Sequence, residues 1–535
     1  MSSAENPAMR TIGAKEQRAI EEAAAAAGTP PAVLMRRAGK ALAERILSLR
    51  AERGEEQVAI LCGAGNNGGD GYAAAVFLHE QNVALRLYES ENAARAGGPD
   101  AQAFRAACLA RGIQPELFKE YVPAPGIILD AVFGSGFRAD RPVSEEFRQL
   151  VARVQEARAR KQAYVLSADL PSGVQADNGS TAEAVIPADE TLCFICPKTG
   201  VYSYPGRKFT GRINMHDLGL GETFINEVWE REQFCTPSVL TSSEVSAWRP
   251  ARAADSHKGS FGRLAVLAGS VGLAGAAVLA GRAALTAGVG YVDLLVPEQI
   301  YPAVLTAVPS VLSQPLPKEA GERLALWRES LRKCSAALAG PGLGANADRE
   351  LILAAAAEAP RLVLDADALN LLGRLETLES GRAALKDRQK RGLEPAVLTP
   401  HPGEFSRLCP EYADLVALDR INSAAALARL TGSAVVLKGA GTVSAFPIGL
   451  EQPEIWINST GNAGMAKAGS GDVLSGLLAS FLAQKLPLKE AVLSAVFLHG
   501  LSADIRAGEL TERALTPEDI LEGLPAAFRQ AGWDK

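Results

Sequence analysis

The sequence predicts two α/β domains, each built around a mostly parallel sheet. Short apolar segments alternate with amphipathic helical segments in both halves of the chain, and motifs rich in glycine and aspartate follow the apolar segments. A chain of 535 residues is also too long for one hydrophobic core, since domains usually hold about 100 to 200 residues. Ligand sites are therefore expected beyond the carboxyl ends of the strands.

The first half begins with helical spacing from residue 15 to about residue 50, and Pro30 and Pro31 start its second helix. Alternation then predicts strands over 58–61, 84–88, 126–132, 164–168 and 191–196. Helical spacing covers 72–79, 101–111 and 145–160. The regular pattern lapses between Asp217 and Lys258, where proline, serine and threonine recur. We therefore expect one domain over residues 1–236 and a second over 237–535.

The second half resumes the alternation. The pattern predicts a small-residue helix over 275–288 and strands over 264–267, 336–339, 361–364, 396–398 and 434–437.

Composition excludes several classes of protein. The net charge of −6 offers no basic surface for nucleic acid or anionic lipid, and no segment is apolar enough for export or membrane spanning, so a cytoplasmic location is expected. Seven scattered cysteines fit a reducing compartment. Cys193 and Cys196 form a CxxC without a second pair at ligand spacing, which favours neither zinc nor redox chemistry. A homo-oligomer stays open.

The most informative motif is the run Gly469-Ser470-Gly471-Asp472 before an apolar helical pattern. The glycines let backbone N–H groups turn inward, and the helix that follows adds the positive end of its dipole, so the motif suits a phosphoryl group. Asp472 is then placed to accept a proton from a substrate hydroxyl as phosphate is transferred. An isolated GSGD is equally compatible with an aspartate that caps a helix after a flexible loop.

In the first half, residues 63–71 read GAGNNGGDG between a predicted strand and a predicted helix, so several backbone amides can converge on an anion. The motif also satisfies G-x-G-x-x-G, with Glu89 about 20 residues on, as in a Rossmann dehydrogenase. The paired asparagines and the aspartate are not part of that fingerprint.

Two aspartates end neighbouring predicted strands and precede glycine loops: Asp130 in LDAVFGSG and Asp169 in DLPSG. Asn67, Asp130 and Ser172 could meet as hard oxygen ligands for a monovalent cation or Mg²⁺, which leaves Asp169 free to move a proton. The alternative is that Asp130 and Asp169 only cap loops and helices.

The second half carries further loops at predicted strand ends. Lys438 with the amides of Gly439 to Thr442 could cradle nucleotide phosphates, although the order of a P-loop is absent. His401 could contact a nicotinamide or a phosphate, or be structural. Asp365 and Asp367 could serve Mg²⁺ or a ribose, or only stabilise the strand end.

Residues 10–235 resemble the YjeF N-terminal family, the NAD(P)H-hydrate epimerases, through LMRRAG at 34–39, GAGNNGGDG, LDAVFGSGF, DLPSG and PKTG at 197–200. The resemblance implies a Rossmann-like three-layer fold and K⁺ bound by Asn67, Asp130 and Ser172. It also implies a hydrate site lined by Asn66, Asn67, Gly68, Gly69, Asp70, Gly134, Ser135, Gly136, Phe137, Arg138, Ala139, Asp140 and Asp169. The family usually has Ile where this chain has Ala168.

From about residue 257 to 524 the loops resemble the YjeF C-terminal family, the ADP- or ATP-dependent NAD(P)H-hydrate dehydratases, whose fold is ribokinase-like. The resemblance implies hydrate contacts at Ala276, Gly344, His401 and Asp472. It implies contacts to ADP, used with Mg²⁺, at Lys438, Gly439, Ala440, Gly441, Thr442 and Gly471. The family often has Thr where this chain has Lys467 and Ser470; the serine keeps the hydroxyl, and the role of Lys467 is unassigned.

The motifs and the two resemblances together give the hypothesis of a bifunctional repair enzyme for hydrated NADH and NADPH. Asp472 deprotonates the ring hydroxyl while ADP phosphorylates it, and elimination restores the double bond with release of AMP and phosphate. Asp169 interconverts the R and S hydrates. A small-molecule kinase with a non-catalytic N-terminal binding module stays open as the alternative, as do ADP against ATP and NADH hydrate against NADPH hydrate.

Overall fold

The computed structural model describes residues 9–54, 57–160, 163–374, 378–447 and 452–533. The chain divides into two compact units, one of residues 10–237 and one of Met9 with residues 238–533 of the described chain. We refer to them as the N-terminal and C-terminal units. Among the described residues, none of the helices has the length and hydropathy that a membrane span needs.

The N-terminal unit holds a seven-stranded sheet of order β4-β3-β2-β5-β6-β7-β8, and every strand pair in it is parallel. The strands are β2 (Val58–Cys62), β3 (Leu85–Glu89), β4 (Glu116–Leu117), β5 (Gly126–Ala131), β6 (Ala163–Ala168), β7 (Glu190–Phe194) and β8 (Arg212–His216). The helices are α1 (Ala14–Ala26), α2 (Pro31–Arg53), α3 (Asn66–Glu80), α4 (Ala93–Ala96), α5 (Pro99–Ala110), α6 (Glu145–Ala159), α7 (Thr199–Tyr202) and α8 (Glu222–Glu232), with 3-10 turns η1 (Phe118–Glu120) and η2 (Gly206–Phe209).

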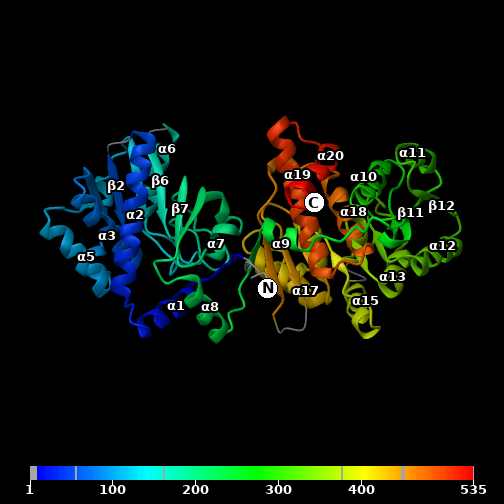
Figure 1. The fold of residues 1–535 in the computed structure, drawn as a ribbon, viewed down its shortest axis with the longest axis horizontal. Coiled ribbons are helices and arrows are strands. Elements are labelled where there is room, and N and C mark those ends of the chain that lie inside the picture. Colours follow the sequence, from blue (N-terminus) through cyan, green and yellow to red (C-terminus); the bar gives the residue numbers. More distant parts are fainter. Residues whose placement is uncertain (1–8, 55–56, 161–162, 375–377, 448–451, 534–535) are drawn as a thin grey trace. The chain divides into compact units, whose positions relative to one another are not determined.

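Both faces of this sheet are buried, because alternate strand residues enter different cores. Ile60 and Leu129 pack with α1, α2 and α3, whereas Leu61 and Ile128 pack with α6 on the opposite face. Figure 1 shows these helices beside the strands that they cover. The result is a three-layer α/β unit in which β2, β5 and β6 lie side by side and end at the same edge.

The C-terminal unit holds an eleven-stranded sheet of order β1-β9-β18-β17-β16-β15-β14-β13-β10-β11-β12. The pairs from β9 to β12 are parallel except β16–β17 and β17–β18, which are antiparallel. The strands are β1 (Met9–Arg10), β9 (Ser238–Leu240), β10 (Arg263–Leu267), β11 (Tyr291–Pro297), β12 (Leu312–Leu316), β13 (Ala336–Ala339), β14 (Leu362–Leu364), β15 (Val397–Leu398), β16 (Ala434–Leu437), β17 (Val443–Phe446) and β18 (Glu454–Asn458).

Helices of this unit separate the strands. They are α9 (Ser242–Ala247), α10 (Ala274–Thr286), α11 (Tyr301–Ala307), α12 (Ala320–Lys333), α13 (Arg349–Glu358), α14 (Asp367–Leu372), α15 (Leu378–Lys390), α16 (Pro402–Leu408), α17 (Arg420–Thr431), α18 (Ser470–Ala483), α19 (Leu488–Leu510) and α20 (Pro517–Gln530), with 3-10 turns η3 (Lys258–Phe261), η4 (Pro410–Tyr412) and η5 (Ala463–Met465). The predicted α/β class is confirmed in both halves. Strands β8, β11, β12, β17 and β18 and the short strands β1, β4 and β9 were not predicted.

Helices α10, α18, α19 and α20 share one core with strands of the C-terminal unit (Figure 1). Helices α10 and α18 approach closely at Gly476, where an added Cβ would lie 2.3 Å from the carbonyl oxygen of Ala280. A side chain at this position would therefore push the two helices apart. The contact fixes where α18, and with it the GSGD motif at its start, lies relative to α10.

Candidate functional sites

The asparagine-rich motif of the N-terminal unit lies at the start of α3. Asn66 to Asp70 form the first turn of this helix, so the helix begins six residues before the predicted 72–79 segment. The turn before it is tight: an added Cβ would lie 1.9 Å from the oxygen of Val132 at Gly63 and 2.0 Å from the oxygen of Gly63 at Gly68. Glycine at both positions therefore lets the start of α3 lie against the end of β5.

Asp130 lies buried at the end of β5 and is held by four hydrogen bonds. Ser172 donates from Oγ (2.5 Å) and from N (2.8 Å), Ser167 Oγ donates at 2.9 Å, and Val132 N at 3.3 Å. Burial raises the pKa of Asp130 to about 6, while the hydrogen bonds from Ser172 lower it. Within the described residues no lysine or arginine pairs with this carboxylate.

The surroundings of Asp130 fit a monovalent cation. Asn67 Nδ2 donates to the carbonyl oxygen of Phe133 (3.0 Å), and Ser172 Oγ lies 3.5 Å from the same oxygen. Asn67, Asp130 and Ser172, predicted to meet, are thus brought together with the Phe133 carbonyl, which sequence reasoning missed because a backbone oxygen has no residue-type signal. Oxygen donors around a buried carboxylate without a cationic partner suit a hard cation.

Asp169 follows β6 and is paired with a buried lysine. Its backbone has φ of +67°, a conformation that costs a non-glycine residue about 1 kcal/mol or more. The ammonium of Lys198 donates to Asp169 Oδ1 and to the carbonyl oxygen of Phe194 (2.7 Å), and Phe194 N donates to the same Oδ1 (3.0 Å). Lys198 belongs to the PKTG motif, but its pairing with Asp169 was not predicted.

Two further carboxylates interact electrostatically with this pair. Burial raises the pKa of Asp70 well above its usual range, and the charge of Asp169 raises it further, while Lys198 lowers it. Burial also raises the pKa of Glu21 on α1, whose carboxylate accepts a hydrogen bond from Gln17 (2.8 Å) and interacts with Lys198 and Asp169. Helix α1 therefore places Glu21 within electrostatic range of Asp169 and Lys198. No sequence motif in α1 predicted this.

The remaining predicted hydrate residues lie in the loop between β5 and α6. Gly134 lies against Asn67, and Phe137 stacks on Phe133 with ring centroids 5.0 Å apart. Ala139 N donates a hydrogen bond to Gln175 Oε1 (3.1 Å). The other members, Ser135, Gly136, Arg138 and Asp140, share this loop, with Arg138 and Asp140 in an exposed ion pair of 3.4 Å.

Glu89, the acidic residue of the Rossmann fingerprint, is hydrogen-bonded to other side chains of the protein. Its buried carboxylate accepts hydrogen bonds from Tyr72 (2.7 Å) and bidentately from Arg105 (2.7 and 2.8 Å). Three hydrogen bonds and the ion pair with Arg105 thus already hold this buried carboxylate. Glu89 therefore gives the dehydrogenase alternative no support.

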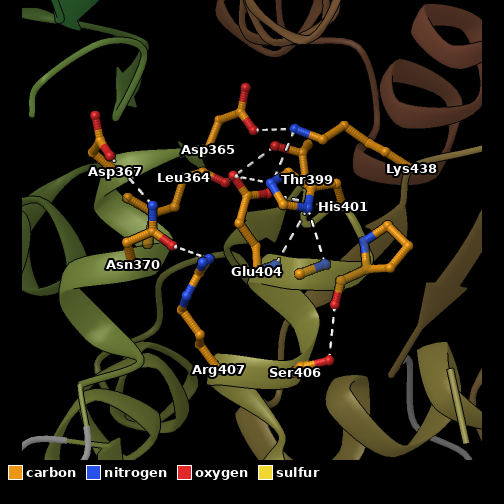
Figure 2. A network of polar contacts seen from close by, with 12 residues as sticks. Leu364, Asp365, Asp367, Asn370, Thr399, His401, Glu404, Ser406, Arg407 and Lys438 are labelled. Atoms are coloured by element: carbon orange, nitrogen blue, oxygen red, sulfur yellow. Dashed lines mark hydrogen bonds and ion pairs between the residues drawn. The ribbon is translucent and has the colours of Figure 1, made fainter. Parts of the chain in front are cut away.

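In the C-terminal unit, three loops at strand ends meet through Lys438 (Figure 2). Its ammonium donates to Asp365 Oδ1 at 2.5 Å and lies 3.8 Å from Glu404 Oε2. Asp365 is buried after β14, and Glu404 is buried on α16. Burial alone would lower the pKa of Lys438, but the charges of Asp365 and Glu404 raise it overall. A charged lysine thus compensates two buried carboxylates.

The GSGD motif lies against this ion pair. Gly469 has φ of +100°, and α18 begins at Ser470. An added Cβ at Gly471 would lie 3.3 Å from Lys438 Nζ and 3.8 Å from Asp365 Oδ2. Burial raises the pKa of Asp472 to about 7, the charge of Asp365 adds to this, and Lys438 lowers it. Asp472 can therefore gain and lose a proton near neutral pH.

His401 is the N-cap of α16, and its side chain is 53% exposed. Its Nδ1 accepts from Gly403 N (3.0 Å) and Glu404 N (3.4 Å), and its Nε2 lies 3.3 Å from Glu404 Oε1 (Figure 2). His401 thus has a structural role as the cap of α16, and the edge of its imidazole ring is also accessible to solvent.

The other predicted hydrate contacts come from α10 and from the loop after β13. Gly344 N donates to Asp367 Oδ2 (2.7 Å), and Asp367 Oδ1 accepts from Asn370 (3.2 Å). Ala276 on α10 lies against that loop, since an added Cβ at Gly342 would be 2.8 Å from its Cβ. The charge of Asp367 also raises the pKa of Asp472. The predicted nucleotide contacts Gly439, Ala440, Gly441 and Thr442 form the turn between β16 and β17.

Lys467 ties the GSGD loop to the segment between α19 and α20. Its ammonium donates to the carbonyl oxygens of Arg513 (2.9 Å) and Leu515. Asp504 on α19 holds the beginning of the same loop, accepting from Gly461 N (2.8 Å) and Asn462 Nδ2 (2.9 Å). The extra charge of Lys467 thus has a structural partner in backbone carbonyls, which its sequence position alone did not reveal.

Cys193 and Cys196 are buried as free thiols. Burial raises the pKa of Cys193 to about 12 and that of Cys196 to about 11, so neither is a reactive thiolate at neutral pH.

Two family models match the chain: "NAD(P)H-hydrate dehydratase" over residues 264–526 and "YjeF-related protein N-terminus" over residues 31–200. The bifunctional NAD(P)H-hydrate repair enzyme Nnr of Coxiella burnetii is 33% identical, covering 95% of this chain and 97% of that protein. The enzyme of the same name from Escherichia coli K12 is 32% identical, covering 97% and 94%.

Among solved structures, an ADP/ATP-dependent NAD(P)H-hydrate dehydratase from Bacillus subtilis, co-crystallised with ATP and Mg²⁺, is 30% identical with a TM-score of 0.46, covering 55% of this chain and 98% of that one. The relatives of matching length carry both halves of this chain. The chain therefore belongs to the family of bifunctional NAD(P)H-hydrate repair enzymes.

Proposed function

We propose that this chain repairs NADH and NADPH that carry an added water on the nicotinamide ring. The C-terminal unit dehydrates the S hydrate at the expense of ADP, and the N-terminal unit interconverts the R and S hydrates. The observation that supports this most is the position of Asp472: a carboxylate with a pKa raised to about 7 at the start of a helix whose glycine lies against Lys438 and Asp365.

In the dehydration, Asp472 accepts the proton of the ring hydroxyl as the hydroxyl oxygen attacks the terminal phosphorus of ADP. The bond between that phosphorus and the bridging oxygen breaks, and AMP leaves. The amides of Ser470 and Gly471 stabilise the charge of the transferring group. Phosphate is a better leaving group than hydroxide, so the C–O bond breaks with phosphate departing and the ring double bond is restored by loss of a proton. The products are the dinucleotide, AMP and phosphate.

ADP is assigned to Lys438, the turn 439–442 and Gly471, and the hydrate to Ala276, Gly344, His401 and Asp472. Mg²⁺ usually takes one or two carboxylates together with nucleotide phosphates and water. Asp365 and Glu404 are the carboxylates beside Lys438 that could serve it. Among the described residues, no three or more acidic, histidine or cysteine side chains form a group that could hold a metal ion by themselves.

In the epimerisation, Asp169 takes the hydroxyl proton of the hydrate as the bond between the hydroxylated carbon and the ring nitrogen breaks. The nitrogen then attacks the other face of the resulting carbonyl carbon and the proton returns to its oxygen, so the carbon is inverted and no atom is gained or lost. Lys198 holds the carboxylate in place. K⁺ bound by Asn67, Asp130 and Ser172 would supply positive charge beside the loop 134–140. Asn66, Asn67, Gly68, Gly69, Asp70 and the loop 134–140 line the hydrate.

The test supplies both hydrate epimers, Mg²⁺, K⁺ and either ADP or ATP to the purified chain and follows nicotinamide absorbance and epimer composition together. We expect recovery of both epimers by the native chain. Asp472→Asn should still exchange epimers but recover none, and Asp169→Asn should recover the S epimer and leave most of the R epimer. Asp414→Asn, an exposed change on the C-terminal unit, is the matched control. Accumulation of a stable phosphorylated hydrate would instead identify a kinase.

A further inference from the structure

A groove of about 490 Å³ lies in the N-terminal unit beside the start of α1, outside the residues given a role above except Arg138. Its walls come from α1, from the loops around Arg138 and Asp177, and from the last residues of the unit. The lining residues are Gly13, Ala14, Lys15, Glu16, Arg18, Arg138, Asp177, Thr199, Cys235, Thr236 and Pro237. Residues 13–18 and 235–237 lie outside the span 31–200 that the family model matches.

The charges of the groove favour an anion. Lys15, Arg18 and Arg138 bring three positive charges, and within the described residues Lys15 and Arg18 form no ion pair. The two acidic side chains are engaged with backbone amides: Glu16 Oε2 accepts from Gly13 N (3.0 Å), and Asp177 Oδ1 accepts from Ala14 N (2.8 Å). Arg18 also interacts electrostatically with Glu21, three residues along α1. Cations at the positive end of a helix attract phosphate groups.

The groove lies next to epimerase residues along the chain. Thr199, which lines the groove, follows Lys198, which pairs with Asp169. Arg138 belongs to the loop 134–140. Arg18 and Glu21 are three residues apart and so share a face of α1, and the pKa of Glu21 responds to Lys198 and Asp169. Arg138, Thr199 and α1 thus relate the groove to the residues around Asp169.

We propose that the groove binds the pyrophosphate and adenosine half of the hydrated dinucleotide, with Lys15 and Arg18 of α1 contacting its phosphate oxygens. The inference rests on the proposed epimerase function and deepens it. The hydrate has one reactive ring and one strongly anionic half, and the groove is a basic depression that shares Arg138 with the predicted hydrate residues. The extra phosphate of NADPH hydrate adds negative charge, so its binding depends more on these two cations than that of NADH hydrate.

Cys235 provides a local reporter. It lines the groove and is the exposed one among the seven cysteines, the other six being buried. The probe is ADP-ribose, which carries the pyrophosphate and adenosine but no nicotinamide, and the readout is the rate at which iodoacetamide alkylates Cys235, located by peptide mass analysis. We expect ADP-ribose to slow this alkylation at least fivefold in the native chain and in Lys40→Met, a matched change at an exposed lysine on α2.

The double variant Lys15→Met with Arg18→Met should lose the protection and raise KM for hydrate in epimerisation about tenfold, with kcat unchanged. Absence of protection in the native chain, equal protection in the double variant, or equal protection by inorganic phosphate would each overturn the proposal. Protection is measured without turnover. A chain that shows protection but no epimerisation would refute the proposed function alone, and epimerisation without protection would refute the groove alone.

Discussion

The pKa of Asp472 predicts the pH dependence of dehydration. The side chain must be ionised to accept the hydroxyl proton, and burial and the neighbouring carboxylates raise its pKa from 3.8 to about 7. The ionised fraction then rises from about 0.1 at pH 6 to about 0.9 at pH 8, so kcat/KM should rise about tenfold over that interval, with a slope of about +1 below pH 7.

Asp365→Asn should shift the acidic limb of the pH profile, the range in which kcat/KM rises with pH, to lower pH. Among the charges that act on Asp472, that of Asp365 raises the pKa most, and its removal also leaves the ammonium of Lys438 free to favour the ionised form of Asp472. Both effects have the same sign, and we expect a shift of about one unit or more, equivalent to about 1.4 kcal/mol. The control Asp414→Asn should leave the limb where it is.

The assay measures kcat/KM for the S hydrate from about pH 5 to pH 9 at saturating ADP and Mg²⁺, with epimerase activity of the same protein as a check of folding. A flat profile across pH 6 to 8 in the native chain would show that Asp472 is not the titrating base. An unshifted limb in Asp365→Asn, with epimerase activity retained, would show that the charge of its neighbour does not set its pKa.

Four other outcomes are expected. The pKa of Asp472 is higher in the folded chain than in the unfolded chain, so its ionisation lowers the stability of the fold as pH rises from about 4 through about 7. Asp472→Asn should therefore increase the free energy of unfolding at pH 8 by up to about 4 kcal/mol and change it little at pH 4. Urea unfolding measures both values, and equal effects at the two pH values would contradict this reasoning. KCl should raise the melting temperature of the native chain more than choline chloride does, and Asp130→Asn should abolish the difference; a K⁺ effect that survives excludes Asp130 as a ligand. Lys467→Met should raise KM for ADP about tenfold with little loss of kcat, and Lys467→Arg should keep KM near that of the native chain. An unchanged KM in Lys467→Met would show that the hydrogen bonds of Lys467 to residues 513 and 515 do not position the GSGD loop for ADP. Glu89→Gln should destabilise the chain by about 3 kcal/mol without altering the preference between NADH and NADPH hydrates. A changed preference would show that Glu89 contacts the substrate.

The central strands could be predicted from the sequence because they are buried on both faces and read as short apolar runs. The start of α3 could not, since asparagine and glycine at 66–71 are poor helix formers and the helix there depends on the close approach of Gly63 and Gly68 to backbone. Strands β8, β11, β12, β17 and β18 and the short strands β1, β4 and β9 were also not predicted. Most of these segments are short, and their pairing partners come from tertiary contacts.

The meeting of Asp130 with Ser172 and Asn67 follows from parallel strands ending at one edge, which a sequence pattern can reveal. The pairing of Lys198 with Asp169 and that of Lys438 with Asp365 could not be derived, because a lysine side chain has several rotatable bonds and its direction is set by the packed structure. The catalytic and binding roles of these residues stay predictions.

Gly476 shows how a substitution can abolish chemistry without touching a reactant. It lies six residues along α18 from Ser470, about 9 Å at the usual rise of a helix. A methyl group there cannot be accommodated against Ala280, so α18 must shift, and the position of its amino end relative to Lys438 changes with it. Kinetic measurements on such a variant would show a loss of dehydration with epimerisation retained, as if a catalytic residue had been changed. The cause would be a displaced helix α18 in an otherwise folded chain.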